Sequence, residues 1–138
     1  MARPPFGVLL VTGGMTHQEN YGAGFLADPR AKIVGLTDEP SVDERRDRLN
    51  RALADAFGVP FLPDPRDALA RRDVHAVSVC SEFERRGRVS QPCVEAGKHL
   101  YVEKPMATNM AEADRLVGTA QGQGIRGKMF TQGGVPDA

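Results

Sequence analysis

Short apolar runs alternate with amphipathic segments along the chain. An unbroken apolar run such as Phe6–Val11, "FGVLLV", is typical of a strand that is covered on both faces of a parallel sheet. The run that begins at Lys32 has the same character and ends on Asp38. We therefore expect strands at 6–11, 32–38, 59–62, 74–80 and 99–102, and a weak final strand at 125–132.

The segment 41–58 carries the clearest helical pattern. Ser41 and Glu44 have the spacing of a capping box, and Gly58 suits the left-handed turn that ends a helix. Between these ends, apolar residues recur at helical spacing and predict one buried face, formed by Leu49, Ala52, Leu53, Ala56 and Phe57.

Four more helices are expected between the other strands. A weak one follows the glycine-rich turn and stops before Pro29, and another begins at Pro65 behind a cap from Asp64. A third covers 88–97. The last starts at Asn109, with Glu112 three residues later, and its predicted apolar face contains Met110, Ala113, Leu116, Val117 and Ala120.

Repeated strand–helix units with short connections predict a doubly wound parallel sheet, a three-layer Rossmann fold. The chain of 138 residues has the size of one domain with a real core. We expect a single dinucleotide-binding domain over 1–138.

Composition narrows the range of partners. The 18 basic and 18 acidic side chains cancel, and no basic cluster is interleaved with aromatic residues, so nucleic acid and anionic membranes are disfavoured. Small molecules or other proteins are therefore the expected partners. No apolar run approaches the roughly 18 residues of a membrane span, and the start of the chain does not resemble a signal peptide, so a cytoplasmic location is expected. Cys80 and Cys93 are interpreted as buried thiols, because their spacing does not suit a metal site.

Ligands of such sheets bind at the carboxyl ends of the strands. The first candidate segment there is the glycine turn, Val11 to Gln18, which directly follows the first strand. Its backbone can approach a phosphate at the start of a helix, although a plain turn would look the same. His17 could contact that phosphate or be a partly exposed histidine at the helix end. Aligned with GxGxxG, only the second glycine is present, because the six positions are Val11, Thr12, Gly13, Gly14, Met15 and Thr16.

Asp38 is the second candidate. A carboxylate there can accept hydrogen bonds from both ribose hydroxyls of an adenosine and would repel a 2′-phosphate, which favours NAD over NADP. Asp38 could also be only a turn former. Arg45 and Arg46 could pair with a phosphate if the start of their helix bends inward, but solvent-exposed positions are the expected ones.

The third candidate is "EKP", Glu103 to Pro105, directly behind the strand at 99–102. Pro105 has no N–H to continue the ladder, so the strand ends there and Lys104 reaches the edge beside the proposed cofactor crevice. Its ammonium could donate to a substrate oxygen. The alternative is an exposed charged pair at a strand end.

The segment "EAGKHLYVEKPMATNMAEADRLV" resembles the signature region of the Gfo/Idh/MocA oxidoreductases, and the resemblance extends upstream over nearly the whole chain. It implies a Rossmann domain that binds NAD, or NADP, followed by a substrate domain that also forms the usual oligomer interface. It further implies that Lys104 lies near the nicotinamide and helps to bind substrate or relay its proton. The implied cofactor contacts are the turn Gly13–Thr16 with Thr12, Asp38, the backbone at Cys80 and Ser81, and Glu103, Lys104 and Pro105.

Some positions depart from the pattern of the family. Val11 replaces the first fingerprint glycine and would crowd a tight turn unless the loop follows another path. The family's threonine, proline, asparagine and histidine after the fourth strand correspond to Ser81, Glu82, Phe83 and Arg86.

The sequence ends at Ala138, and we expect the family's second domain, which carries the substrate site and the usual catalytic histidine or aspartate, to be absent from it. The leading hypothesis is the nucleotide-binding half of an NAD(P)-dependent oxidoreductase that acts on a sugar, a polyol or a related compound. The alternatives are a non-catalytic binding or regulatory module, with a partner chain over its crevice, and a fragment of a longer dehydrogenase.

Overall fold

The structure, a computed structural model, describes residues 5–125 and the backbone of 127–130. Six parallel strands form one sheet in the order β3-β2-β1-β4-β5-β6. The winding reverses between β1 and β4, as in a Rossmann fold. The strands are β1 (Phe6–Val11), β2 (Ala31–Thr37), β3 (Phe61–Leu62), β4 (Ala76–Val79), β5 (His99–Glu103) and β6 (Gly127–Phe130).

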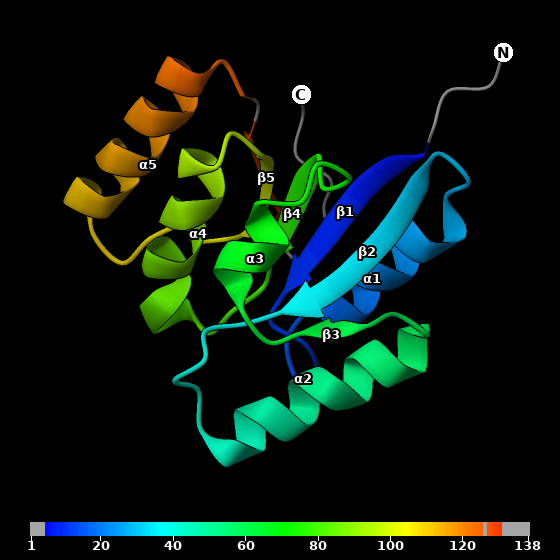
Figure 1. Cartoon of the computed structure of the whole chain (residues 1–138). Helices are drawn as coiled ribbons and strands as arrows, with labels where there is room; N and C mark the ends of the chain where they lie inside the picture. The colour runs from blue at the N-terminus through cyan, green and yellow to red at the C-terminus, as the bar shows by residue number, and fades with distance from the viewer. Residues whose placement is uncertain (1–4, 126, 131–138) are drawn as a thin grey trace, which may run out of the picture.

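Helices cover both faces of the sheet and complete the three predicted layers (Figure 1). On one face lie α1 (Gln18–Ala27) and α2 (Glu44–Phe57). The other face carries α3 (Pro65–Leu69), α4 (Arg86–Glu95), which follows a 3-10 turn at Phe83–Arg85, and α5 (Met110–Gln123). The doubly wound fold is therefore confirmed. No helix in the described part of the chain is long and apolar enough to cross a membrane.

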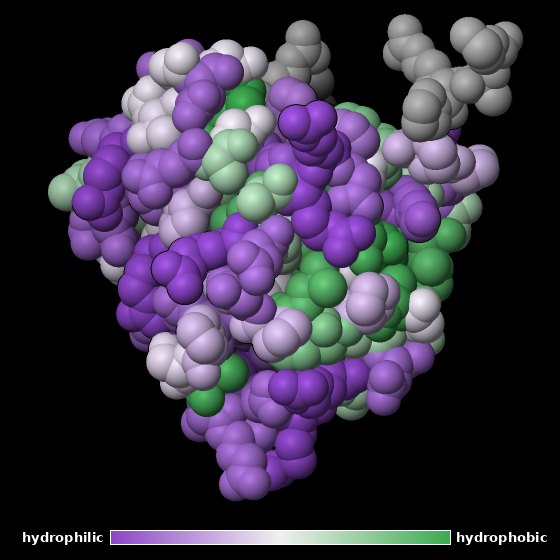
Figure 2. Space-filling model, in the orientation of Figure 1, coloured by the Kyte–Doolittle hydropathy of each residue, from purple (hydrophilic) through white to green (hydrophobic). Residues whose placement is uncertain are grey.

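The central strand β1 divides the core into two clusters. Leu9 and Val11 pack among residues under α3, α4 and α5, whereas Val8 and Leu10 pack among residues under α1 and α2. All four are almost completely buried, as the unbroken apolar run predicts. On the outside, apolar side chains gather right of centre along β2, and polar ones surround them (Figure 2). Cys80 and Cys93 are buried free thiols, as expected.

The start of α2 differs from the prediction. Asp43, not Ser41, is the N-cap, and its carboxylate accepts a hydrogen bond of 2.7 Å from the backbone N–H of Arg46. A carboxylate interacts favourably with the positive end of the helix dipole, which a hydroxyl cannot match. Gly58 ends the helix with φ 67° as expected.

The buried face of α2 also differs from the prediction. Ala52 and Ala56 are exposed, while Arg46 and Asn50 are buried together with Leu53 and Ala54. The polar pair belongs to the first half of the helix, which lies against the glycine turn after β1.

The last helix, α5, has the predicted N-cap, but its buried face differs from the predicted one. The side chain of Asn109 accepts from the N–H of Glu112 at 2.9 Å. Met110 and Val117 are 73% and 43% exposed, and both line a surface pocket of about 540 Å³. Because α5 is the outermost helix and packs mainly on α4, only a narrow stripe centred on Leu116 is buried. The predicted strand at 125–132 is present at 127–130, and 126, 131 and 132 lie outside the described residues.

Truncation of Leu10 tests the core under α1 and α2. Leu10 is fully buried, so we expect Leu10→Ala to lower the free energy of unfolding by about 2–5 kcal/mol through lost burial and a residual cavity. Leu26→Ala is the control, since Leu26 is 53% exposed on α1 and should cost at most about 0.5 kcal/mol. Urea denaturation followed by circular dichroism measures both, and equal losses would contradict the assignment of the core.

Candidate functional site

The register of the sheet places four polar or nucleophilic side chains in one row. Val11 is aligned with Thr37 on one side and Val79 on the other, and Val79 is aligned with Val102. The residues that directly follow these four strand positions therefore lie side by side at the carboxyl edge of the sheet. They are Thr12, Asp38, Cys80 and Glu103, and all are buried.

The glycine turn follows a path that relieves Val11 of any crowding. Val11 stays within β1, and the left-handed backbone conformation falls instead on Thr12 and Met15, with φ 72° and 60°. For a β-branched residue such as Thr12 this conformation costs about 1–2 kcal/mol, which the surrounding hydrogen bonds must offset.

The amides of the turn bond to groups inside the protein. The N–H of Gly13 donates to Asn50 Oδ1 at 2.7 Å, and a Cβ on Gly13 would lie 2.7 Å from the Asn50 Cα, so the turn presses against α2. The N–H groups of Met15 and Thr16 donate to the carboxylate of Glu19 at 2.8 and 3.3 Å. Glu19 therefore occupies the anion position at the start of α1. Thr16 and Glu19 have the Thr-x-x-Glu spacing of a capping box, a sequence signal that could have predicted this contact.

Asp38 lies where the sequence predicts, directly after β2, and is 1% exposed. Its carboxylate accepts five hydrogen bonds, from the Thr12 hydroxyl (3.1 Å), the Asn50 amide (2.9 Å), the Glu39 N–H (2.8 Å) and two guanidinium nitrogens of Arg85 (2.6 and 2.9 Å). A carboxylate has about four lone-pair sites, so Asp38 is saturated.

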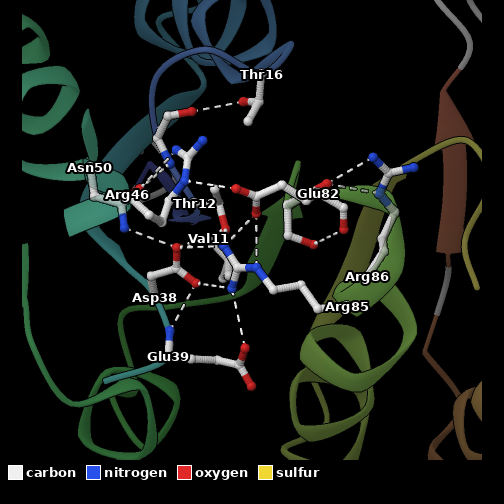
Figure 3. A network of polar contacts seen from close by, with 12 residues as sticks. Val11, Thr12, Thr16, Asp38, Glu39, Arg46, Asn50, Glu82, Arg85 and Arg86 are labelled. Carbon is white, nitrogen blue, oxygen red and sulfur yellow. Dashed lines mark hydrogen bonds and ion pairs between the residues drawn. The ribbon is translucent and has the colours of Figure 1, made fainter. Parts of the chain in front are cut away.

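Arg85 is the central cation of this network and was not predicted. Figure 3 shows its guanidinium among the carboxylates of Asp38, Glu39 and Glu82. Its N–H groups make five hydrogen bonds, two to Asp38 and one each to Glu39, Glu82 and the hydroxyl of Thr12. The side chain is 12% exposed. All five donors of the guanidinium are therefore used inside the protein.

The expectation that Arg46 is solvent-exposed is wrong. Arg46 is buried, not solvated, and donates to Glu82 at 3.0 Å and to the carbonyl of Gly14 at 2.7 Å. The start of α2 therefore lies against the turn, while the neighbouring Arg45 is exposed. Glu82, a departure from the family pattern, thus has two cationic partners, Arg46 and Arg85.

The other end of the row contains the "EKP" segment. The buried carboxylate of Glu103 pairs with His17 Nδ1 at 2.9 Å, and His17 is partly exposed at the start of α1. Lys104 is exposed and has no hydrogen bond or ion pair with another described residue. Arg86 donates to the carbonyl oxygens of Ser81 and Pro105, and so joins the start of α4 to this segment. Among the described residues, no cluster of His, Cys, Asp or Glu could hold a metal ion.

Several side chains of the site have shifted pKa values, among them Asp38, Cys80 and Tyr21. Burial raises the pKa of Asp38, but the hydrogen bonds and charge of Arg85 outweigh it, and the pKa lies below its ordinary value. Burial, helped by the charge of Glu103, raises the pKa of the Cys80 thiol to about 12, so this thiol stays protonated. Burial, and then a hydrogen bond to Glu103, also raises the pKa of Tyr21.

A pocket of about 570 Å³ opens beside Asp38 and is lined by the ends of β1 and β2 and by residues of α3 and α4. Its wall is largely apolar and includes the buried side chains of Leu69 and Val89. Four prolines line it, namely Pro40, Pro63, Pro65 and Pro92. Space of this size next to a carboxylate suits a flat, partly apolar ring system joined to a hydroxylated sugar.

The lowered pKa of Asp38 predicts acid sensitivity. At pH 7 we expect Asp38→Asn to lower the free energy of unfolding by about 3 kcal/mol, because Arg85 loses a buried partner. A depressed pKa stabilises the fold above the unfolded value near 4, and this contribution disappears as the pH falls through the folded value. The difference from wild type should therefore shrink by pH 3.

Urea denaturation at pH 7 and pH 3 measures that difference. Asp55→Asn is the control, because Asp55 is exposed on α2 and should have little effect at either pH. If Asp38→Asn lowered the free energy of unfolding equally at both pH values, the ionised carboxylate of Asp38 would not be the source of the stabilisation.

Comparisons with known proteins agree with the Rossmann fold of this chain. The sequence pattern of the Gfo/Idh/MocA oxidoreductases, which have an NAD-binding Rossmann fold, matches residues 6–130. The myo-inositol 2-dehydrogenase of Thermotoga maritima is 36% identical over 101 residues, which are 70% of this chain and 30% of that enzyme. The chain therefore spans less than a third of the length of this relative.

Solved structures of longer proteins share the fold of this chain. GenD2 from gentamicin A biosynthesis, in complex with NAD, matches with a TM-score of 0.80 and 25% identity over 94% of this chain and 35% of its own. A biliverdin reductase from Synechocystis, in complex with biliverdin and NADP+, shares the fold, with a TM-score of 0.76 and 22% identity over 91% of this chain and 38% of its own. The chain thus belongs to the Gfo/Idh/MocA oxidoreductase family and contains its NAD-binding Rossmann domain.

Proposed function

We propose that this chain is the nucleotide-binding half of an NAD(P)-dependent oxidoreductase that transfers hydride between nicotinamide and a hydroxyl or carbonyl of a sugar, a polyol or a related compound. The observation that carries the proposal is the row formed by Thr12, Asp38, Cys80 and Glu103 beside the pocket of about 570 Å³. It lies at the carboxyl edge where the winding of the sheet reverses, the usual place for a dinucleotide.

The pocket suits the adenosine end of the dinucleotide. Its prolines and Leu69 offer flat apolar contacts for an adenine, and Asp38 at its rim is in position for the ribose hydroxyls. Such contacts favour NAD, with NADP as the alternative. The pyrophosphate would meet the turn Gly13–Thr16, where the carboxylate of Glu19 would have to give up the two amides that it now accepts from.

The nicotinamide would then lie near Cys80, Ser81 and the "EKP" segment. A bound nicotinamide supplies the hydride chemistry, and the exposed ammonium of Lys104 is free to donate to the substrate oxygen or protonate it. Glu103, the last residue of β5, and Pro105 flank Lys104 and would fix its position. We assign the rest of the substrate site, and an oligomer interface, to the second domain that family members carry.

The internal hydrogen bonds of the site favour one other function, a non-catalytic binding or regulatory module. Both the turn amides and Asp38 have full sets of partners within the chain. Such a module would keep the fold, have no nicotinamide affinity, and bind a partner protein over the crevice.

Titration with NADH separates the two functions. We expect NADH fluorescence to respond to the chain and Asp38→Ala to weaken the binding about tenfold or more, the value of hydrogen bonds to a charged acceptor. AMP should compete with NADH, since the adenosine pocket lies in this chain.

Asp55→Ala is the matched control, because it removes one carboxylate from the exposed side of α2. Circular dichroism establishes that both variants are folded. A folded wild-type chain that gives no response at millimolar NADH would refute the dinucleotide site and support the binding module.

A further inference from the structure

Arg85 occupies the atoms of Asp38 that a ribose would need. Two of its nitrogens bond to the two carboxylate oxygens at 2.6 and 2.9 Å, in the planar two-point geometry that suits a guanidinium. The Thr12 hydroxyl and the Asn50 amide also bond to one of these oxygens. No lone pair of Asp38 remains for a 2′- or 3′-hydroxyl while Arg85 is in place.

The charge of Asp38 is neutralised in the same way. Asp38, Glu39 and Glu82 face Arg46, Arg85 and Arg88, three acids against three arginines in direct ion pairs. A carboxylate discriminates against NADP because its charge repels the 2′-phosphate. With Arg85 bound to it, Asp38 neither accepts from the hydroxyl nor repels the phosphate.

We propose that Arg85 determines cofactor affinity and specificity in this domain by competing with the adenosine ribose for Asp38. This inference rests on the proposed function. NAD must displace the guanidinium to reach the carboxylate, and the displacement reduces the affinity that Asp38 would otherwise give. If Asp38 is free of Arg85 in about one molecule in ten, the apparent dissociation constant rises about tenfold.

The rival role for Arg85 is direct binding of the cofactor phosphates. A free, exposed guanidinium would suit that role, but all five donors of Arg85 are already used and its side chain is 12% exposed. The two roles predict opposite effects when the cation is removed. Loss of a phosphate ligand weakens the binding of both dinucleotides, whereas loss of a competitor strengthens the binding of NADH.

The experiment measures dissociation constants for NADH and for NADPH by fluorescence titration at fixed ionic strength. We expect Arg85→Gln to tighten NADH binding about tenfold and to raise the ratio of the NADPH to the NADH constant about tenfold, because the bare carboxylate then repels the 2′-phosphate. A role of Arg85 in folding alone would not change this ratio.

Arg45→Gln is the matched control for net charge. Arg45 is exposed in the first turn of α2 and makes no hydrogen bond or ion pair with the described residues of the network, so its loss should change both constants less than about threefold and leave their ratio unchanged. Arg85→Lys is the second variant if Arg85→Gln fails to fold, as judged by circular dichroism. An ammonium keeps the charge but lacks the planar two-point geometry, so a smaller change of the same sign is expected.

Three results would overturn the proposal. If the Arg85 variants weaken NADH binding more than Arg45→Gln does, Arg85 is a ligand of the cofactor. If NADH binding tightens with an unchanged ratio, Arg85 does not act at the ribose. In both cases the dinucleotide site itself still stands. If no folded variant binds either dinucleotide at millimolar concentration, the proposed function is refuted together with this inference.

Discussion

A buried carboxylate at the carboxyl edge of the sheet constrains most of what surrounds it. Asp38 is almost completely inaccessible, and an ionised group in that position is tolerated only if neighbouring donors replace the water that it has lost. Thr12 after β1, Asn50 on α2 and Arg85 before α4 supply those donors. Three segments that are far apart in the sequence are thereby fixed around one oxygen atom, and the turn, the helix start and the loop take their positions from it.

Much of the fold could be predicted because it depends on periodicity. The strand at 6–11 has the predicted bounds, and the helices on both faces follow from the alternation of elements. The exact start of a helix was harder to predict where two residues could cap it. Asp43 displaces Ser41 as the cap of α2, and because the two candidate caps stand only two residues apart, the capping-box spacing alone does not identify the start of the helix. The exposure of Met110 follows from the outer position of α5, which its own sequence does not encode.

The site was predictable where a motif marks it and not where charged side chains bury one another. The glycine turn, Asp38 and the end of β5 lie together at one edge, as expected for their places after parallel strands. Arg46 and Arg85 carry no local signal of burial, because a lone arginine in a polar stretch is normally solvated. Their partners are supplied by other segments, and Asp38 is 47 positions from Arg85 along the chain. Pairing of this kind is set by the tertiary structure alone.

The close approach of Gly13 to α2 has an evolutionary consequence. The turn has no room for a Cβ beside Asn50, and Asn50 in turn bonds to both Gly13 and Asp38. The residues at these positions share hydrogen-bond partners, so the effects of substitutions there on the free energy of unfolding are not expected to add. A lineage that exchanges Asn50 or Asp38 alone leaves a buried donor or acceptor unpaired, and one that exchanges Gly13 alone forces a Cβ against Asn50. The residues of this corner are therefore expected to change in concert, and intermediates with a single change should be rare among natural descendants of the sequence.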